Sequence, residues 1–273
     1  MRAWVNGRIL ESIDEAAITV TDHGFTVGDG VFEAVKVVDG VPFALSRHLA
    51  RLSRSAAALG LPPVDEQLVR RAVAESMAGQ DLPLGRLRIT WTGGVAPMGS
   101  NRGEAPPTLT CVAGAMAPYP ETAAAVSVPW PRNERGALAG VKSTSYAENV
   151  VALAHAAERS ADEALFANTL GNICEGTGSN IFYVVDGELR TPTLASGCLA
   201  GVTRALVLEW FGGREVDEPM AALEAASEAF LVSTTRDVQG IHSLDGRRLP
   251  APGPVTREAA RTWALREAEQ PDP

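Results

Sequence analysis

The stretch GVKSTSYAENVVALAHAAE, residues 140–158, changes character halfway along its length. Its first half places Lys142 among glycine, valine and hydroxyl-bearing residues, and its second half has helical periodicity from about Tyr146 to Arg159. A lysine in such a position is compatible with two interpretations. It is either a solvated surface lysine or an amine held in a pocket for nucleophilic chemistry. The rest of the chain has to decide between them.

Composition limits the classes of function. The chain has 273 residues, which allows one large domain or two ordinary ones, and 45% of them are hydrophobic. A formal net charge of −9 argues against general binding to nucleic acid or to an anionic membrane. The first residues have no apolar targeting core, and no apolar run reaches the ~20 residues that span a bilayer. We therefore expect a cytoplasmic protein without nucleic-acid or membrane partners.

The cysteines and histidines do not form a recognisable metal or disulfide pattern. The three cysteines are far apart and odd in number, which suits reduced thiols better than a disulfide framework or a zinc site. The four histidines, at positions 23, 48, 155 and 242, are scattered along the chain. No metal site is expected.

Local patterns predict a mixture of strands and helices. Three turn dipeptides between strand-like runs predict β-hairpins, at Asn6-Gly7, Asp39-Gly40 and Asp186-Gly187. The segment 46–61 has helical periodicity, with Ser46 as a plausible N-cap and Gly60 after the last turn. Further predicted helices cover 65–79, 146–159 and 201–212, and further predicted strands cover 86–94, 107–115, 125–130, 163–168 and 228–234.

Strands and helices do not alternate regularly, which favours an α+β protein of two lobes over a doubly wound sheet. Two prolines among small polar residues suggest a linker over 116–124. The expected organisation is an N-terminal lobe over 1–115 and a C-terminal lobe over 125–273.

Three short motifs carry the polar residues that invite a functional interpretation. GDGVF, from Gly28, precedes a strand rather than a helix and is therefore a poor dinucleotide fingerprint. LAGVTRALVLEW begins a helix at Gly201, where backbone N–H groups attract an anion, although an ordinary helix start has the same pattern. NICEGTGSN places Glu175 after an apolar pair, where a half-buried carboxylate needs a cationic partner.

In this order and spacing, these motifs resemble the class IV aminotransferases, which are fold type IV enzymes that use pyridoxal 5'-phosphate. The family includes branched-chain aminotransferases, D-amino-acid aminotransferases and 4-amino-4-deoxychorismate lyase. The resemblance begins at TDHGFTVGDGVFEAVKVVDGVPFALSRHLARL and continues through KSTSYAENVVALAHA and DEALFANTLGNICEGTGSNIFYVVDGELRTP. It ends with GCLAGVTRALVLE and STTRDVQGI, so it covers nearly the whole chain.

The resemblance implies a role for most of these residues. Lys142 holds the cofactor aldehyde as a Schiff base and acts as the general base. Glu175 keeps the pyridine nitrogen protonated, so that the ring accepts electrons, and Arg51 binds the phosphate. The other cofactor-binding residues implied are Tyr146, Asn180, Leu199, Val202, Thr203 and Thr234. Those implied on the substrate side are Phe32, Arg102 and Thr235.

The sequence gives less guidance on the substrate. The Arg-x-His pair of D-amino-acid aminotransferases is missing from RITWTGGVAPMGSN, and KSTSY lacks the paired glycines usual in branched-chain enzymes. We expect an aminotransferase that acts on a small amino acid or amine and a 2-oxo acid. The alternative is 4-amino-4-deoxychorismate lyase, whose dicarboxylate would meet Arg102, Arg132 or Arg135 unless these are solvated loop arginines. A non-catalytic scaffold of this fold is the third hypothesis.

The family also implies a homodimer in which a loop of the N-terminal lobe reaches the neighbouring subunit's site. The segment from Gly93 to Pro107 is the candidate loop, because it is long and rich in small residues.

Overall fold

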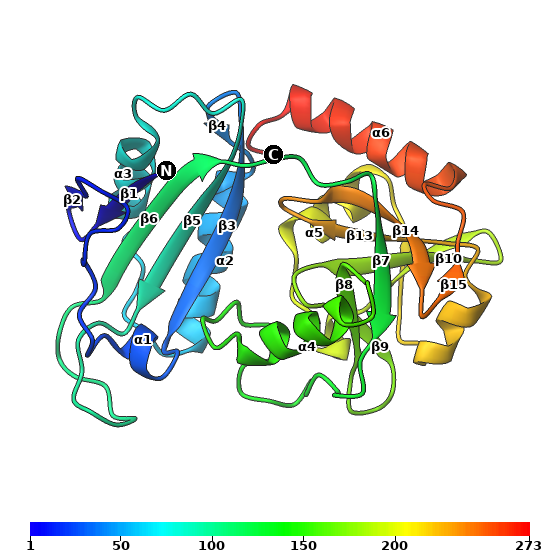
Figure 1. Ribbon diagram of the computed structural model, residues 1–273, viewed down its shortest axis with the longest axis horizontal. Helices are drawn as coiled ribbons and strands as arrows, with labels where there is room; N and C mark the ends of the chain where they lie inside the picture. The colour runs from blue at the N-terminus through cyan, green and yellow to red at the C-terminus, as the bar shows by residue number, and fades with distance from the viewer. The chain divides into compact units, whose positions relative to one another are not determined.

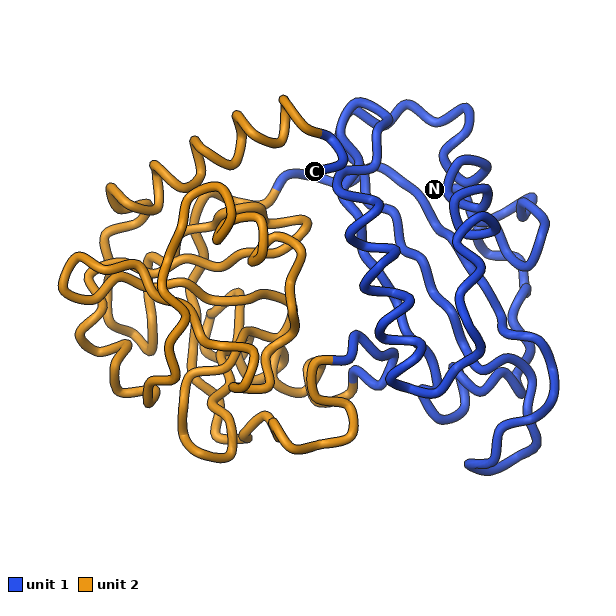
Figure 2. Tube along the Cα trace, turned by 180° about the vertical axis from the view of Figure 1, so that it is seen from behind, with its two compact units in different colours: residues 1–118, 141–146, 271–273 blue, residues 119–140, 147–270 orange.

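The computed structural model describes residues 1–273, in which two compact units can be distinguished (Figures 1 and 2). Unit 1 consists of Met1–Pro118, Val141–Tyr146 and Pro271–Pro273, and unit 2 consists of Tyr119–Gly140 and Ala147–Gln270. The chain first leaves unit 1 after Pro118, inside the segment that the sequence predicts as a linker. The segment with Lys142 belongs to unit 1, although both of its neighbours in sequence belong to unit 2.

Unit 1 is an antiparallel sheet covered by helices. The strands, in the order β2-β1-β6-β5-β3-β4, are β2 (Arg8–Ile9), β1 (Arg2–Val5), β6 (Thr108–Ala115), β5 (Leu84–Thr92), β3 (Gly30–Val38) and β4 (Val41–Pro42). The helices are α1 (His23–Thr26), α2 (Leu45–Ala58) and α3 (Glu66–Met77). Alternate residues of β3, among them Val31 and Val35, point into a core shared with α2 and α3, which cover that face (Figure 1).

Unit 2 contains a nine-stranded mixed sheet. Its path is β12 (Arg214–Val216), β11 (Glu188–Pro192), β10 (Asn180–Val185), β13 (Glu228–Ser233), β14 (Asp237–Leu244), β7 (Thr122–Ser127), β8 (Glu163–Ala167) and β9 (Ile173–Gly176), with β15 (Arg247–Arg248) paired to β14. The helices are α4 (Ala147–Ala157), α5 (Val202–Trp210) and α6 (Pro254–Glu269), with 3-10 turns at η1 (Leu194–Ser196) and η2 (Met220–Ala225). All six residues of β10 are buried, as expected for a strand inside a sheet covered on both faces.

The predicted hairpins are confirmed. The residues of each turn have positive φ, for example 48° at Asp39 and 77° at Gly40, which is the geometry of a two-residue type I′ turn. Asp245-Gly246 forms a fourth turn of this kind, between β14 and β15, that the sequence reasoning missed.

Two boundaries differ from the expected ones. The strand expected over 125–130 is β7 at Thr122–Ser127 and ends before Pro129, which has no N–H to donate. Ser46 is not the N-cap of α2, because the helix begins at Leu45 after Ala44, which has a φ of 52°. Asp272 takes over the capping role by accepting hydrogen bonds from the N–H and the hydroxyl of Ser46, at 2.8 and 2.6 Å. Local sequence could not reveal a cap that comes from 226 residues away.

No helix has the combination of length and apolar composition that crossing a membrane requires.

Candidate active site

The Lys142 segment adds to the edge of the unit 1 sheet. The N–H of Phe32 donates to the Lys142 carbonyl at 3.0 Å, and the N–H of Thr144 donates to the Gly30 carbonyl at 2.8 Å. An antiparallel bridge joins Val31 and Ser143 between these bonds. The lysine is therefore held by backbone pairing with the first residues of β3.

The GDG motif explains how the segment approaches so closely. Gly28 has a φ of +71°, and a Cβ there would lie 2.6 Å from the Ser145 hydroxyl. A Cβ at Gly30 would lie 3.0 Å from the Thr144 hydroxyl. These two glycines make room for the strand that carries Lys142. The motif therefore has a structural role in the sheet, and this agrees with its poor match to a dinucleotide fingerprint.

The Lys142 side chain is partly buried and lies over the ring of Phe32. Its Nζ lies 4.5 Å from the centroid of the Phe32 ring, and the Tyr146 ring meets that ring edge-on at 5.4 Å. Phe32 and Tyr146, expected on the substrate and cofactor sides respectively, therefore contact each other beside Lys142.

Arg88 is a further candidate that the sequence reasoning missed. Its guanidinium carbon lies 3.9 Å from the Phe32 ring centroid, and Arg88 itself is exposed on β5. No ion pair involves this guanidinium. The signal in the sequence was the alternation in RLRI, where Leu87 and Ile89 are buried while Arg88 points to the opposite face.

Arg51, the expected phosphate ligand, belongs to a buried network on α2. Its Nε and Nη2 donate to the two carboxylate oxygens of Glu33 at 2.8 and 2.6 Å, and His48 Nδ1 lies 2.6 Å from the same carboxylate. Burial by itself would raise the pKa of Glu33, but the Arg51 charge and the hydrogen bonds from Arg51 and His48 outweigh it and lower the pKa to about 2. Burial also lowers the pKa of His48, so the imidazole is neutral and donates its proton to Glu33.

Glu33 was not among the predicted site residues, because in sequence it is one charged position in an alternating strand. It fixes the guanidinium of Arg51 in one orientation through two parallel bonds.

Arg102 lies in the 93–107 loop and is occupied by other partners. It donates to both oxygens of Asp29, at 2.7 and 2.5 Å, and to the carbonyls of Leu59 and Gly60. Asp29 also binds His23 Nδ1 at 2.8 Å, and His23 Nε2 meets the Gly99 carbonyl at 3.1 Å. This cluster ties the loop to the body of unit 1, so the Arg102 donors are engaged within the protein.

Unit 2 holds the second group of expected residues. Glu175, on β9, accepts a hydrogen bond from the N–H of Leu199 at 2.8 Å. Asn180 Nδ2 donates to the Leu199 carbonyl at 2.9 Å. Asn180 thereby holds the backbone of the residue that binds Glu175. The Glu175 carboxylate also lies near Arg132, whose Nε is 3.4 Å from Oε1.

The start of α5 is shaped for an anion. A Cβ on Gly201 would collide with Asn180 Oδ1, so a larger residue at the N-cap would have to displace the Asn180 side chain from Leu199. The helix begins at Val202 without a side-chain cap, and Thr203 is buried in its first turn. The N–H groups of this turn therefore lack the usual side-chain acceptor and favour a phosphate.

Thr234 and Thr235 directly follow β13 in the turn that leads to β14, and both are half-buried. Arg135 is largely exposed beside Glu134. The expected site residues therefore form two groups, one in each unit. The group in unit 1 consists of Phe32, Arg51, Arg102, Lys142 and Tyr146. The group in unit 2 consists of Glu175, Asn180, Leu199, Val202, Thr203, Thr234 and Thr235.

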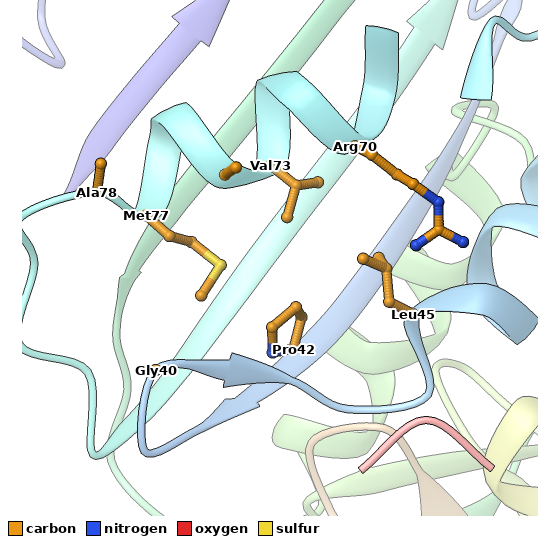
Figure 3. A pocket seen from close by; sticks show the side chains of 8 residues that line it. Gly40, Pro42, Leu45, Arg70, Val73, Met77 and Ala78 are labelled. Carbon is orange, nitrogen blue, oxygen red and sulfur yellow. The ribbon is translucent and has the colours of Figure 1, made fainter. Parts of the chain in front are cut away.

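A separate groove in unit 1 lies between α3 and the β4 region and has a volume of about 430 Å³ (Figure 3). Met77 and Val73 point into it, and its one charged residue, Arg70, pairs with Glu66 at 2.8 Å. The groove contains none of the expected site residues and lacks the converging polar groups of a reactive site.

Known proteins resemble this chain over most of its length. The family model described as amino-transferase class IV matches residues 30–244. A putative branched-chain-amino-acid aminotransferase of Methanocaldococcus jannaschii is 34% identical over 90% of this chain and 89% of its own length. A D-alanine aminotransferase of Bacillus licheniformis is 30% identical over 94% of both chains.

Solved structures agree with these matches. A branched-chain aminotransferase of Thermoproteus uzoniensis, crystallised with norvaline, superposes with a TM-score of 0.88 at 30% identity, over 97% of this chain and 93% of its own. A hypothetical aminotransferase of Mycobacterium tuberculosis in its PLP-bound form superposes with a TM-score of 0.86 at 27% identity, over 97% and 98% of the two chains.

Proposed function

This chain belongs to the class IV aminotransferases, which have fold type IV and use pyridoxal 5'-phosphate, and from that premise we propose that Lys142 is its catalytic amine. The enzyme is a transaminase that acts on amino acids and keto acids. The observation that carries the proposal for Lys142 is its backbone pairing with β3 beside Phe32 and Tyr146.

The residues of each unit fit the cofactor chemically. In unit 2, the start of α5 at Gly201, which has no side-chain cap, suits a phosphate, and the Glu175 carboxylate suits a protonated ring nitrogen. In unit 1, Lys142 supplies the amine that reacts with an aldehyde, and Arg51 supplies a preoriented guanidinium. We assign Val202, Thr203 and Thr234 to the phosphate, and Tyr146, Leu199 and Asn180 to the ring and its supports.

When bound, the cofactor supplies a protonated ring that draws electrons from the substrate carbon. The chain moves the protons. Lys142 Nζ takes the proton from the carbon that bears the substrate amino group and later returns a proton, as a general base and then a general acid. The Phe32 ring, 4.5 Å from Nζ, keeps the amine close to one face of the substrate and excludes water from that side.

We assign the substrate carboxylate to Arg88. Amino acids and 2-oxo acids both carry a carboxylate next to the reacting carbon, and an arginine without an acidic partner is suited to bind it. Arg88 and Lys142 both lie over the Phe32 ring, at 3.9 and 4.5 Å from its centroid, and this shared neighbour supports the assignment. Arg102 is a weaker candidate, because its donors already bind Asp29 and two carbonyls. Phe32 and Thr235 remain proposed contacts on the substrate side.

A homodimer in the cytoplasm completes the proposal. Two surfaces support self-association. On unit 2, α4 exposes Val150, Val151 and Leu153, and on unit 1, Phe25 and Val20 are largely exposed. Isolated monomers rarely leave such apolar faces in water. We further propose that the 93–107 loop reaches the partner's site. Light scattering that finds a fully active monomer at assay concentration excludes both ideas.

Borohydride reduction followed by peptide mapping tests the central assignment. The pyridoxyl group is expected on Lys142. Lys36, which is the only other lysine and is fully buried, serves as the internal control, and label on Lys36 contradicts the proposal. A screen of D- and L-amino acids and amines with pyruvate and 2-oxoglutarate then defines the substrates. A parallel assay for aminobenzoate detects the lyase alternative, and absence of any cofactor would indicate a scaffold.

A further inference from the structure

Arg132 lies against the same pair of strands that carries Glu175. Its N–H donates to the Ala167 carbonyl at 2.7 Å, and a parallel bridge joins it to Asn168, so its backbone is fixed at the end of β8. Its guanidinium carbon lies 4.1 Å from the centroid of the Phe166 ring. Phe166 is the antiparallel partner of Glu175 in the β8–β9 ladder. Direct partners in such a ladder share a face of the sheet, so the guanidinium over Phe166 is brought next to the Glu175 carboxylate.

The contact between Arg132 and Glu175 is an ion pair without a completed hydrogen bond. Nε lies 3.4 Å from Glu175 Oε1, and the two side chains are only 16% and 14% exposed. Nε is buried and has no hydrogen-bond acceptor. On its other side, Nη1 binds Glu148 Oε2 and Asn149 Oδ1, both at 3.0 Å, which holds the guanidinium in place.

The Glu175 carboxylate is largely buried beside Phe166, where a charged group needs a partner of opposite charge. It accepts the hydrogen bond from the N–H of Leu199 with Oε2, and its Oε1 lies 3.4 Å from Nε of Arg132. Cys174 and Cys198 are buried neighbours whose pKa values are raised by burial, so they remain neutral thiols and add no charge. Arg132 is therefore a cation of unit 2 that faces this carboxylate.

We propose that Arg132 is a positioning residue that keeps Glu175 ionised and aimed, so that Glu175 holds a proton on the cofactor's ring nitrogen. The inference deepens the proposed function and rests on it for the role of Glu175. It also gives Arg132 a place other than the substrate carboxylate for which the sequence made it a candidate. The guanidinium is engaged with Glu148, Asn149, Phe166 and Glu175.

The first test uses the protein without cofactor. Denaturant unfolding is measured for Arg132→Met, Glu175→Gln and the double variant. Arg132→Met is expected to lower the midpoint strongly when Glu175 is present and much less in the Glu175→Gln background, because the variant then leaves no buried charge unpaired. Additive effects would show that the two side chains are not coupled and would overturn the proposal.

A matched control separates coupling from general damage. Arg190 in the same unit is 17% exposed and pairs with Glu188 and Glu218, away from Glu175. Arg190→Met is expected to be additive with Glu175→Gln. If Arg132→Met does not fold, Arg132→Gln replaces it, because glutamine also removes the charge that faces Glu175 but keeps a polar side chain. Equal coupling to Glu175 for the Arg132 and Arg190 variants contradicts the assignment.

The second test reads the ring nitrogen directly. Pyridoxal phosphate labelled with ¹⁵N in the ring is bound to each variant, and its chemical shift reports protonation. The wild-type shift is expected to be that of a protonated ring, the Arg132→Met shift to move toward the neutral ring, and Arg132→Lys to restore it in part. The dissociation constant of the cofactor should rise about tenfold in Arg132→Met, which corresponds to ~1.4 kcal/mol.

The two tests distinguish the possible failures. Coupling in the cofactor-free protein without any binding of pyridoxal phosphate would refute the proposed function while leaving the ion pair intact. An unchanged ¹⁵N shift in a folded Arg132→Met variant that binds the cofactor would refute the positioning role itself.

Discussion

Two carboxylates near the proposed site, Glu33 in unit 1 and Glu175 in unit 2, are bonded in different ways. In unit 1, the Glu33 carboxylate is fully enclosed and receives three short bonds from Arg51 and His48. In unit 2, Glu175 stays slightly exposed, and its cation Arg132 lies just beyond hydrogen-bond geometry. The comparison indicates that Glu33 serves as a structural support for Arg51, whereas the more accessible Glu175 is suited to meet a ligand.

The largest expected effect concerns Glu175. Glu175→Gln should retain the cofactor but lower kcat by 10²–10³, equivalent to ~2.7–4 kcal/mol, because an amide cannot hold the ring nitrogen protonated. Steady-state kinetics and cofactor absorbance on the same sample measure both quantities. An unchanged turnover would remove Glu175 from the role of ring partner.

Substitution of Glu33 should mainly lower the free energy of unfolding. Glu33→Gln leaves the buried Arg51 charge without its counter-ion, and breaking a buried pair in this way costs about 3–5 kcal/mol of unfolding free energy. Chemical denaturation measures the loss. Glu66→Gln is the matched control, because Glu66 is exposed and pairs with Arg70 one helical turn away, and such pairs contribute ~0.3–0.5 kcal/mol. Similar losses for the two variants would mean that the Glu33 network is not a structural support.

Low pH should destabilise the protein through the network of Glu33, His48 and Arg51. The pKa of Glu33 is lowered from 4.5 to about 2, so its contribution is complete above 4.5 and is lost as the pH falls toward 2. The pKa of His48 is also lowered, so protonation of this histidine in the unfolded chain begins to reduce stability below 6.5. The unfolding free energy should therefore decline from about pH 6.5 downward, and the decline below 4.5 should be shallower in Glu33→Gln. Parallel pH curves for the two proteins would contradict this assignment.

The smallest expected effect concerns His23 in unit 1. Its contribution to stability is lost as the pH rises, whereas those of Glu33 and His48 are lost as the pH falls. The hydrogen bond to Asp29 raises the pKa of His23 above 6.5, so the His23 contribution is complete below 6.5 and is lost as the pH rises through the raised value. A neutral imidazole has only one N–H, so it cannot donate to both Asp29 and Gly99. Hydrogen exchange in the 93–107 loop, corrected for the intrinsic effect of pH, should become faster at alkaline pH by a few-fold, on the order of 1 kcal/mol. A His23→Gln variant should exchange equally fast at both pH values.

Sequence reasoning worked best where the signal is local or forms an ordered series of motifs. The Asn-Gly and Asp-Gly turns need only two residues, and the family followed from motifs spread along most of the chain. It missed Glu33 and Arg88, which look like ordinary charged positions in alternating strands until the sheet brings them to Arg51 and Phe32. Partners far apart in sequence have no local signature. The same reason explains the wrong N-cap of α2, because Asp272 replaces Ser46 from the other end of the chain.

Unit 1 is assembled from three separate segments of the chain, and this affects how it folds during synthesis. A ribosome releases Met1–Pro118 first, but the unit still lacks Val141–Tyr146 and the cap from Pro271–Pro273 at that stage. At about 5–20 residues per second, the last of these segments emerges on the order of 10 s later. During that interval the nascent sheet has an unpaired edge at Gly30–Phe32, where the Lys142 segment will pair, and an uncapped α2. This edge is the place where a chaperone or a neighbouring nascent chain can add a strand first.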